Sequence, residues 1–529
     1  FAWCDCAVAA CYALRSIAGY VTECRTGRYG ASMPCKVKIL LSTYLTPRTM
    51  SSENIALDIE KELGFVPTAG QQRAIVLLSH FVTTPKPHAA CILRGYAGTG
   101  KTSIISALVR VMRKWQKTVV LLAPTGRAAK VFARMAGEGA YTIHRMIYRQ
   151  ETFRGEGTRF DLGYNKLRNA LFIVDEASMI ATGTTGEPSV FGSGELLDDL
   201  MRYVYMSAGC RLLFVGDTAQ LPPVGETESA ALSNATLERY GMLVGSADLT
   251  EVVRQSHESD VLAGATRIRQ LLAEEYYGIP PISTSAHGEV RVLPGNELIE
   301  SLVSDYRDYG TDGVIVVTRS NKRANVYNNG IRARIFDREE ALTRGDLVMA
   351  VKNNYYWTER AAKRLPEKEE LPFSFIANGD TAEVMSIRNV HEQYGFSFAD
   401  ATLRFPDYND CELDCRLLLS TLQSESPSLT AAERTTLYER VMEDYAHLPS
   451  KKDRLKALRE DAYYNALQIK YAYAVTCHKA QGGQWARVYV DQGYVPDEAL
   501  GTPYLRWLYT AFTRTTDRVY LVNWTGPTC

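Results

Sequence analysis

Short, almost continuous apolar runs alternate with helical patterns through most of the chain. Each run is bounded by charged or turn residues, as expected for strands that are buried on both faces of a parallel sheet. A helical pattern, Ser103–Lys114, follows the first run. This alternation predicts an α/β unit. Its predicted strands are Ala89–Arg94, Thr118–Ala123, Ala170–Val174 and Arg211–Val215.

Two segments interrupt this first unit. Arg149–Lys166 is polar and aromatic and contains three glycines, so we predict a small hairpin insertion there. Ala181–Glu195 contains four glycines and a proline, a composition that indicates a flexible loop. Neither segment has the apolar pattern of a buried element.

A second α/β unit is predicted to begin near Leu249, and a segment of different character interrupts it. Within that segment, Thr430 and Glu433 form a capping-box pattern that opens a charged helix, and Pro449 ends it. A second charged helix is expected over Lys451–Ala466. The segment also has β-rich stretches at Gly345–Val351, Thr381–Arg388 and Phe396–Phe405. The predicted strands of the second unit itself are Gly313–Val317, Tyr471–Val475, Val488–Val490 and Val519–Val522.

Composition narrows the class of protein without naming a function. The chain has 529 residues, with 60 Lys plus Arg balanced by 60 Asp plus Glu. A strongly basic nucleic-acid-binding protein is thereby excluded, although a local basic groove is not. No apolar stretch is long enough for a membrane-spanning helix. Eleven cysteines without a CxxC pair favour a reducing, cytoplasmic compartment.

The strongest chemical motif is the sequence GYAGTGKT, which occupies Gly95–Thr102 between a predicted strand and a predicted helix. It matches the P-loop pattern, in which backbone N–H groups and a helix N-terminus hold phosphate oxygens. Lys101 would reach the β- and γ-phosphates, and Thr102 would ligate Mg²⁺. The sequence therefore predicts a site for a nucleotide and Mg²⁺.

Two acidic residues follow the third predicted strand. Asp175 would hold the Mg²⁺ shell at the carboxyl edge of the sheet, and Glu176 would accept a proton from an attacking water. The fourth strand leads into GDTAQLPPV, where Gln220 could contact the γ-phosphate. A rigid turn is the alternative reading of that last segment.

In this order and spacing, these motifs resemble superfamily 1 helicases, most closely the 1B branch typified by RecD, Dda and the Pif-type enzymes. Further similar segments are TAGQQRA at Thr68–Ala74, APTGRA at Ala123–Ala128, TIH at Thr142–His144, LTEVVRQ at Leu249–Gln255, TRSN at Thr318–Asn321, TCHKAQGGQ at Thr476–Gln484 and YTAFTR at Tyr509–Arg514. The resemblance covers roughly residues 63–524.

The resemblance implies roles for individual residues. Gln71 would contact adenine, and Arg254 and Arg514 would act as arginine fingers from the second unit, so the implied catalytic set is Lys101, Glu176, Gln220, Arg254 and Arg514. The implied ATP-binding residues are Gln71, Gly95, Gly98, Thr99, Gly100, Lys101, Thr102, Gly482 and Gln484. The implied DNA-binding residues are Pro124, Thr125, Thr142, His144, Thr318, Asn321, Thr476 and His478.

The family also implies an architecture of two RecA-like parallel-sheet domains in tandem. Residues 50–248 would form domain 1A, with a small 1B insertion at about 149–166 that parts the duplex. Residues 249–344 and 467–529 would form domain 2A. Residues 345–466 would form an SH3-like β-barrel with a helical arm, which is either a tower for DNA or a partner, or a solvated hairpin. Residues 1–49 are a segment of uncertain order, with Met33 and Met50 as candidate starts.

We therefore expect a monomeric, cytoplasmic, bacterial or phage-like ATP-dependent DNA helicase, with no membrane association. It would translocate on single-stranded DNA, in the 5′-to-3′ direction that the 1B branch implies, and would act at single-strand–duplex junctions in repair, recombination or replication. Two alternatives stay open: an ATPase subunit of a RecBCD-like nuclease complex, and a superfamily 1 helicase that acts on RNA.

Overall fold

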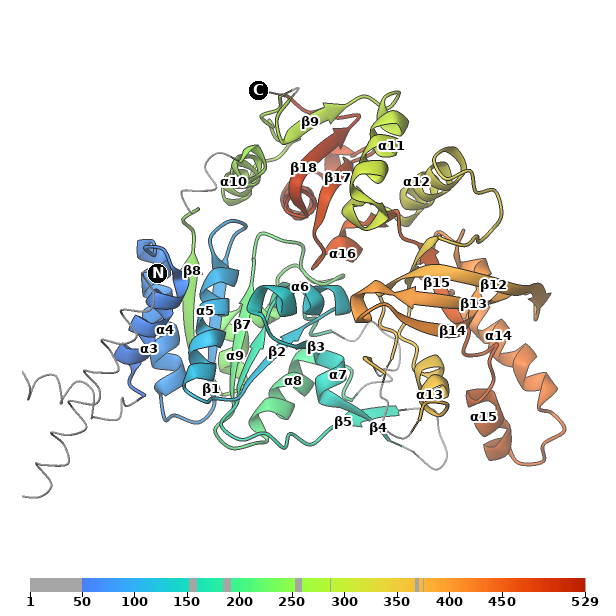
Figure 1. Cartoon of the computed structure of the whole chain (residues 1–529), viewed down its shortest axis with the longest axis horizontal. Coiled ribbons are helices and arrows are strands. Elements are labelled where there is room, and N and C mark those ends of the chain that lie inside the picture. The colour runs from blue at the N-terminus through green and yellow to red at the C-terminus, as the bar shows by residue number, and fades with distance from the viewer. Residues whose placement is uncertain are drawn as a thin grey trace, which may run out of the picture.

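The computed structural model describes residues 50–151, 159–183, 192–252, 259–285, 287–366, 371–373 and 375–528. The predictions for residues 1–49 and for Arg254 fall outside these residues. Figure 1 shows a first α/β lobe in blue to green, a second lobe at the top, and an orange barrel with a helical arm to the right.

The first lobe is built on a parallel sheet, and an apolar cluster covers each of its two faces. Along β6, Ile173 packs into one apolar cluster while Phe172 and Val174 pack into the other. The sheet order is β3-β2-β6-β7-β1-β8, and the pairs are parallel. The strands are β1 (Ala89–Gly95), β2 (Val119–Ala123), β3 (Ala140–Thr142), β6 (Leu171–Val174), β7 (Arg211–Gly216) and β8 (Leu243–Leu249), and the helices are α3 (Ser52–Leu63), α4 (Ala69–Thr83), α5 (Lys101–Lys114), α6 (Gly126–Ala136), α7 (Ile143–Ile147), α8 (Leu196–Tyr205) and α9 (Asn234–Arg239).

The predicted insertion of the first lobe is an antiparallel hairpin of β4 (Tyr148–Glu151) and β5 (Arg159–Leu162). The second lobe is another parallel sheet, in the order β16-β10-β17-β18-β9. Its strands are β9 (Val290–Leu293), β10 (Val314–Thr318), β16 (Ala474–Thr476), β17 (Trp485–Asp491) and β18 (Thr515–Val522), and its helices are α10 (Asp260–Ala273), α11 (Leu298–Tyr309), α12 (Asn321–Arg334), α16 (Cys477–Ala480) and α17 (Thr502–Phe512).

The segment inserted in the second lobe forms a closed barrel with a helical arm. The arm packs against the barrel, because Leu437, Val441 and Leu458 share an apolar cluster with Phe396 and Phe398. The arm is therefore docked along one side rather than solvated all round. The strands are β11 (Leu347–Ala350), β12 (Thr381–Gln393), β13 (Phe396–Phe405), β14 (Cys411–Leu418) and β15 (Leu467–Tyr471), and the helices are α13 (Tyr356–Ala362), α14 (Ala431–Asp444) and α15 (Lys451–Arg459).

The predicted fold class is confirmed, but some strands differ from the pattern. The run Tyr471–Val475 is divided, because Tyr471 ends the barrel strand β15 and Ala474 begins β16 of the second sheet. The barrel thus extends beyond residue 466. Strand β8 was missed because it lies at a sheet edge, where Leu243 is 53% exposed and the apolar signal is weak. Strands β3, β9 and β14 were also not foreseen.

No helix in the described part of the chain is both long enough and apolar enough to span a membrane.

A buried carboxylate joins the barrel to the second lobe. Asp346, which is fully buried just before β11, accepts hydrogen bonds from Nε and Nη2 of Arg332 on α12, each at 2.9 Å. Arg338 Nη1 at 2.9 Å, the Thr343 amide at 2.7 Å and the Tyr473 hydroxyl at 3.2 Å complete its shell. Burial alone would raise the pKa of Asp346, but these hydrogen bonds hold it below its ordinary value.

We predict that Asp346→Asn lowers the free energy of unfolding by about 3 kcal/mol, because it leaves the Arg332 charge buried without its counter-ion. Since the folded-state pKa is depressed, the stabilisation is present above the unfolded pKa of about 4 and is lost as the pH falls through the folded value. Urea unfolding between pH 7 and pH 3 measures both effects.

Asp414→Asn is the matched control for this substitution. Asp414 pairs with Arg388 at 2.9 Å, but the two side chains are 65% and 56% exposed. An exposed pair contributes at most about 1 kcal/mol. Equal losses in the two variants would contradict the role given to Asp346.

Candidate nucleotide cleft and nucleic-acid groove

The P-loop lies between β1 and α5, as the motif predicts. Gly98 and Gly100 adopt φ values of +74° and +84°, which a residue with a Cβ rarely takes. Lys101 begins α5, and its Nζ donates to the carbonyl oxygens of Gly95 and Tyr96 at 2.6 and 2.9 Å. The lysine is therefore folded back onto its own loop, with an ammonium group available for phosphate.

The P-loop is braced from inside. Thr99 is fully buried, and its hydroxyl donates to the Tyr96 carbonyl at 2.8 Å. Gln71 Nε2 donates to the Thr99 carbonyl at 3.0 Å, while Gln71 Oε1 accepts from the Thr68 amide and so caps α4. In this structure Gln71, 1% exposed, supports the P-loop. Its contact with adenine stays a prediction.

The two acidic residues after β6 differ in environment. Burial and, to a lesser extent, the neighbouring charge of Glu176 raise the pKa of Asp175 to about 7, against the opposing charge of Lys101. Glu176 has φ +50°, an uncommon conformation for a residue other than glycine, asparagine or aspartate. Such strain is typical of sites where a side chain must be aimed.

These residues line a cleft of about 1010 Å³ to which both lobes contribute. Among the described residues, Gln220 Oε1 is buried without a hydrogen-bond partner at the lining of this cleft, so it is available to a ligand. The cleft brings together Gly98, Gly100, Lys101, Thr102, Asp175, Glu176, Gln220, Gly482, Gln484 and Arg514 of the predicted residues.

Arg514 crosses from the second lobe toward the acidic pair. Its Nη1 lies 3.7 Å from Glu176 Oε1, and its side chain is 5% exposed. Gly482 also approaches the first lobe closely. It has φ +74°, and a Cβ placed there would lie 2.8 Å from the Ala128 Cβ. We call the boundary between the two lobes at this cleft the seam. The two lobes lie close enough there for one ligand to contact both.

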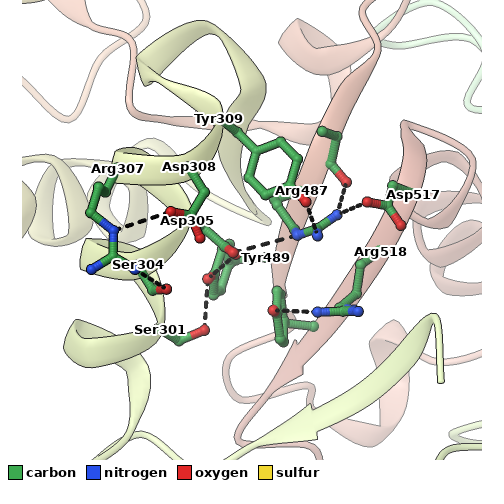
Figure 2. Close-up of polar contacts among 12 residues, drawn as sticks. Ser301, Ser304, Asp305, Arg307, Asp308, Tyr309, Arg487, Tyr489, Asp517 and Arg518 are labelled. Atoms are coloured by element: carbon green, nitrogen blue, oxygen red, sulfur yellow. Dashed lines mark hydrogen bonds and ion pairs between the residues drawn. The ribbon is translucent and has the colours of Figure 1, made fainter. Parts of the chain in front are cut away.

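A buried arginine anchors the strand that follows Arg514. Figure 2 shows Arg487 of β17 between α11 and β18, where it pairs with Asp517 and contacts the Tyr309 hydroxyl. Its Nε lies 3.4 Å from Asp305 Oδ1, and Asp305 accepts from the Tyr489 hydroxyl at 2.6 Å. Asp517 lines the nucleotide cleft, so this network fixes one wall of it.

The residues present fit a divalent cation beside a bound phosphate. Thr102 and Asp175 supply a hydroxyl and a carboxylate oxygen, the hard donors that Mg²⁺ prefers, and both line the cleft. The raised pKa of Asp175 reflects a buried negative charge that a cation would neutralise.

A second hollow, of about 700 Å³, lies where the two lobes meet the barrel. It gathers Thr125, Asn321, Thr476 and His478 of the predicted DNA-binding residues. Thr318 does not line this hollow, because it is fully buried, and its hydroxyl donates to the Ser320 carbonyl at 3.1 Å. We call this hollow the central groove.

Besides Thr318, three further predicted DNA-binding residues do not line the central groove. Thr142 is buried and caps α7 by accepting from the Arg145 amide. His144 lies beside Tyr148, and burial lowers its pKa to about 4. Pro124 sits just before Thr125, which caps α6. Roles for these three in DNA binding stay predictions.

The groove also contains cations that the motifs did not single out. Arg127 lies over the Trp485 ring at 4.0 Å, which joins the first lobe to the second. Lys479 Nζ is buried and, among the described residues, has no hydrogen-bond partner, and burial lowers its pKa to about 8. Arg319 adds a further guanidinium, whereas Lys322 is paired with Glu425 at 3.4 Å. Lys479 lies within the segment TCHKAQGGQ, but the sequence does not indicate that its ammonium group is buried.

Comparison with known proteins matches two separate parts of the chain. Residues 68–274 match a family model described as an AAA domain, and residues 471–522 match one described as a UvrD-like helicase C-terminal domain. The chain is 22% identical over 502 residues to an uncharacterized protein of Acanthamoeba polyphaga mimivirus, covering 82% of this chain and 95% of that protein.

Two named relatives are helicases. The ATP-dependent RecD2 DNA helicase of Deinococcus radiodurans is 32% identical over 182 residues, which are 34% of this chain and 21% of that one. The ATP-dependent DNA helicase dda of Enterobacteria phage T4 is 23% identical over 292 residues, 53% and 60% of the two chains. This chain thus spans about a fifth of the first relative and under two thirds of the second.

Solved structures give a weaker likeness. Pif1 helicases at forked double-stranded DNA share 16% identity, with a TM-score of 0.43 over 87% of this chain and 92% of that one. Bacteroides Pif1 with ADP-AlF3 and single-stranded DNA shares 18% identity, with a TM-score of 0.37 over 87% and 93%. Both TM-scores are below 0.5, so neither likeness supports an assignment of function to this chain. The two matched domains stand in the order that the motifs predict, and together with the two helicase relatives they support the resemblance of this chain to the superfamily 1B helicases.

Proposed function

We propose that the protein is an ATP-dependent DNA helicase that couples ATP hydrolysis to translocation on single-stranded DNA and to duplex unwinding. The observation that carries this proposal is the approach of Arg514, from the second lobe, to Glu176 beside the P-loop of the first. A nucleotide between them would contact both lobes, so binding and hydrolysis would change how the lobes are held together.

Each residue of the cleft then has a chemical role. Lys101 and Arg514 neutralise negative charge on the phosphoryl oxygens, Glu176 accepts a proton from the attacking water, and Gln220 contacts the γ-phosphate. Thr102 and Asp175 hold Mg²⁺, which when bound would supply further charge neutralisation. Arg254 would act together with Arg514 as the second arginine finger.

The loop after β7 provides a physical link from the cleft to the central groove. Asp217 and Gln220 line the cleft, whereas Gln481 lines the groove. Gln481 Nε2 donates to the Leu221 carbonyl at 2.8 Å. A displacement of this loop in the cleft would therefore move Gln481 in the groove.

The central groove is suited to a single strand. Hydroxyl and amide groups can hold phosphate oxygens, and aromatic or guanidinium planes can stack on bases. Its positive side chains explain how a chain of zero net charge would bind a polyanion. We further propose 5′-to-3′ movement, with the β4–β5 hairpin as the wedge at the single-strand–duplex junction and a monomer as the active form.

Unwinding of duplexes with a 5′ or a 3′ single-stranded tail, with and without ATP, tests this proposal. We expect ATP-dependent unwinding of the 5′-tailed duplex. ATPase stimulated by RNA rather than DNA would favour an RNA helicase, and ATPase without unwinding would favour a subunit of a nuclease complex. Absence of any nucleic-acid-stimulated ATPase would overturn the proposal.

We predict that Glu176→Gln lowers kcat for DNA-stimulated ATP hydrolysis by about 10²- to 10⁴-fold, because the general base is lost, while ATP binding is retained. Lys101→Ala should instead weaken ATP binding itself, since the phosphates lose a counter-charge. Phosphate release and binding of a fluorescent ATP analogue separate the two effects. Glu238→Gln, at an exposed position on α9, is the control, and an unchanged kcat in Glu176→Gln would remove this residue as the base.

Gly482→Ala tests whether closure of the seam matters. Its new Cβ would press on Ala128 of the opposite lobe, so we expect at least a tenfold loss of DNA-stimulated ATPase, the order of effect that a small misplacement causes. Gly493→Ala has similar backbone strain at φ +60°, but among the described residues nothing lies within 4 Å of its Cβ. Similar activities in the two variants would show that the contact across the seam is irrelevant.

His478→Ala probes the groove. Burial lowers the pKa of His478, so the side chain is neutral at pH 7 and its contact with DNA releases no counter-ion. We expect single-stranded DNA affinity to fall about tenfold, as for loss of one stacking side chain, with no change in the slope of affinity against salt. Fluorescence anisotropy at several salt concentrations measures both, with His447→Ala on the arm as control. A reduced salt slope would contradict a neutral contact.

A further inference from the structure

A buried tyrosine of the second lobe reaches into the P-loop of the first. The Tyr509 hydroxyl, near the end of α17, accepts from the Ala97 amide at 2.9 Å and donates to Asp217 Oδ2 at 2.6 Å. Tyr509 is 1% exposed, and burial raises its pKa well above the ordinary value, so it stays protonated and can donate. One hydroxyl thus joins α17, the P-loop and the loop after β7.

The next residue of α17 makes a second bond across the seam. The Thr510 hydroxyl accepts from the Leu221 amide at 2.9 Å and donates to the Arg506 carbonyl within its own helix at 2.7 Å. Two consecutive side chains therefore fix the last turn of α17 to the first lobe. We call Tyr509 and Thr510 the seam anchor.

The side chain of Arg514 takes its direction from the same turn. Its Nε donates to the Thr510 carbonyl at 3.0 Å, and its Nη2 donates to the Thr513 hydroxyl at 3.1 Å. The remaining terminal nitrogen, Nη1, is the one that lies 3.7 Å from Glu176. Beyond Arg514, the pairing of Asp517 with Arg487 holds the chain from the other side (Figure 2).

We propose that Tyr509 is a positioning residue for ATP hydrolysis, because its hydroxyl ties the turn that aims Arg514 to the P-loop that holds the phosphates. This inference rests on the proposed function. The hydrogen bonds of Tyr509 fix the position of the second lobe relative to the first, and so fix the direction from which Arg514 approaches the phosphates. Without these bonds the nucleotide would still bind, but the Arg514 guanidinium would be misplaced.

A purely structural role would be to satisfy the buried Asp217. The chain offers a matched comparison, because Tyr504 lies on the same helix, is also 1% exposed, and donates to Gln492 Oε1 at 2.6 Å within the second lobe. Both tyrosines lose one buried hydroxyl on replacement by Phe. Only the bonds of Tyr509 cross the seam.

The first test compares Tyr509→Phe with Tyr504→Phe in DNA-stimulated ATP hydrolysis and thermal unfolding. We expect kcat to fall about 10- to 100-fold in Tyr509→Phe, with KM for ATP changed less than about threefold, since an interaction that acts in the transition state is lost. Tyr504→Phe should keep kcat within about twofold of the wild type. Thr510→Val removes the other bond of the anchor and replaces Tyr509→Phe in this test if the latter is unstable. We expect it to lower kcat in the same way.

The second test asks whether Tyr509 acts through Arg514. Single-turnover hydrolysis is measured for Arg514→Ala alone and combined with Tyr509→Phe. Residues that act as a unit are non-additive, so the double variant should be no slower than Arg514→Ala. Additive losses, or equal kcat values in Tyr509→Phe and Tyr504→Phe, would overturn the inference while leaving the proposed function intact. A wild-type protein without DNA-stimulated ATPase would overturn both.

Discussion

The structure depends on hydrogen bonds that cross one seam. Two hydroxyl groups on α17 satisfy backbone amides of the first lobe, one in the P-loop and one in the loop after β7. Buried amides that lacked these partners would be costly, so the lobes have a preferred register even with no nucleotide between them. The cleft, the finger and the link to the central groove all follow from that register.

The distribution of charge matters more than its sum. The chain is neutral overall, yet Arg127, Arg319, Lys322 and Lys479 gather at the central groove. Lys479 illustrates the cost, because burial lowers its pKa to about 8 and so disfavours its own charge. Phosphate would repay that cost, since it supplies the counter-charge that the described protein residues around its Nζ do not.

The barrel packs closely against both lobes. Asp346 connects it to α12 of the second lobe. On its other side, Asp380 and the Tyr408 hydroxyl approach Gly126 at the start of α6, where a Cβ would lie within 2.5 Å of both. Burial raises the pKa of Asp380 to about 7, and Tyr408 donates to it at 3.0 Å. The barrel therefore forms a wall of the central groove rather than a separate appendage.

Local chemistry was readable from the sequence, because it depends on neighbours along the chain. The P-loop glycines, the four predicted strands of the first lobe and the capping box of Thr430 and Glu433 all lie where their patterns predict. Contacts between distant residues were not readable. The partners of the Tyr509 and Thr510 hydroxyls lie 412 and 289 positions away, and no local pattern encodes which donor a hydroxyl will meet. Tertiary packing likewise turned Gln71 toward the P-loop and divided Tyr471–Val475 between two sheets, because burial and pairing are settled only when separate elements meet.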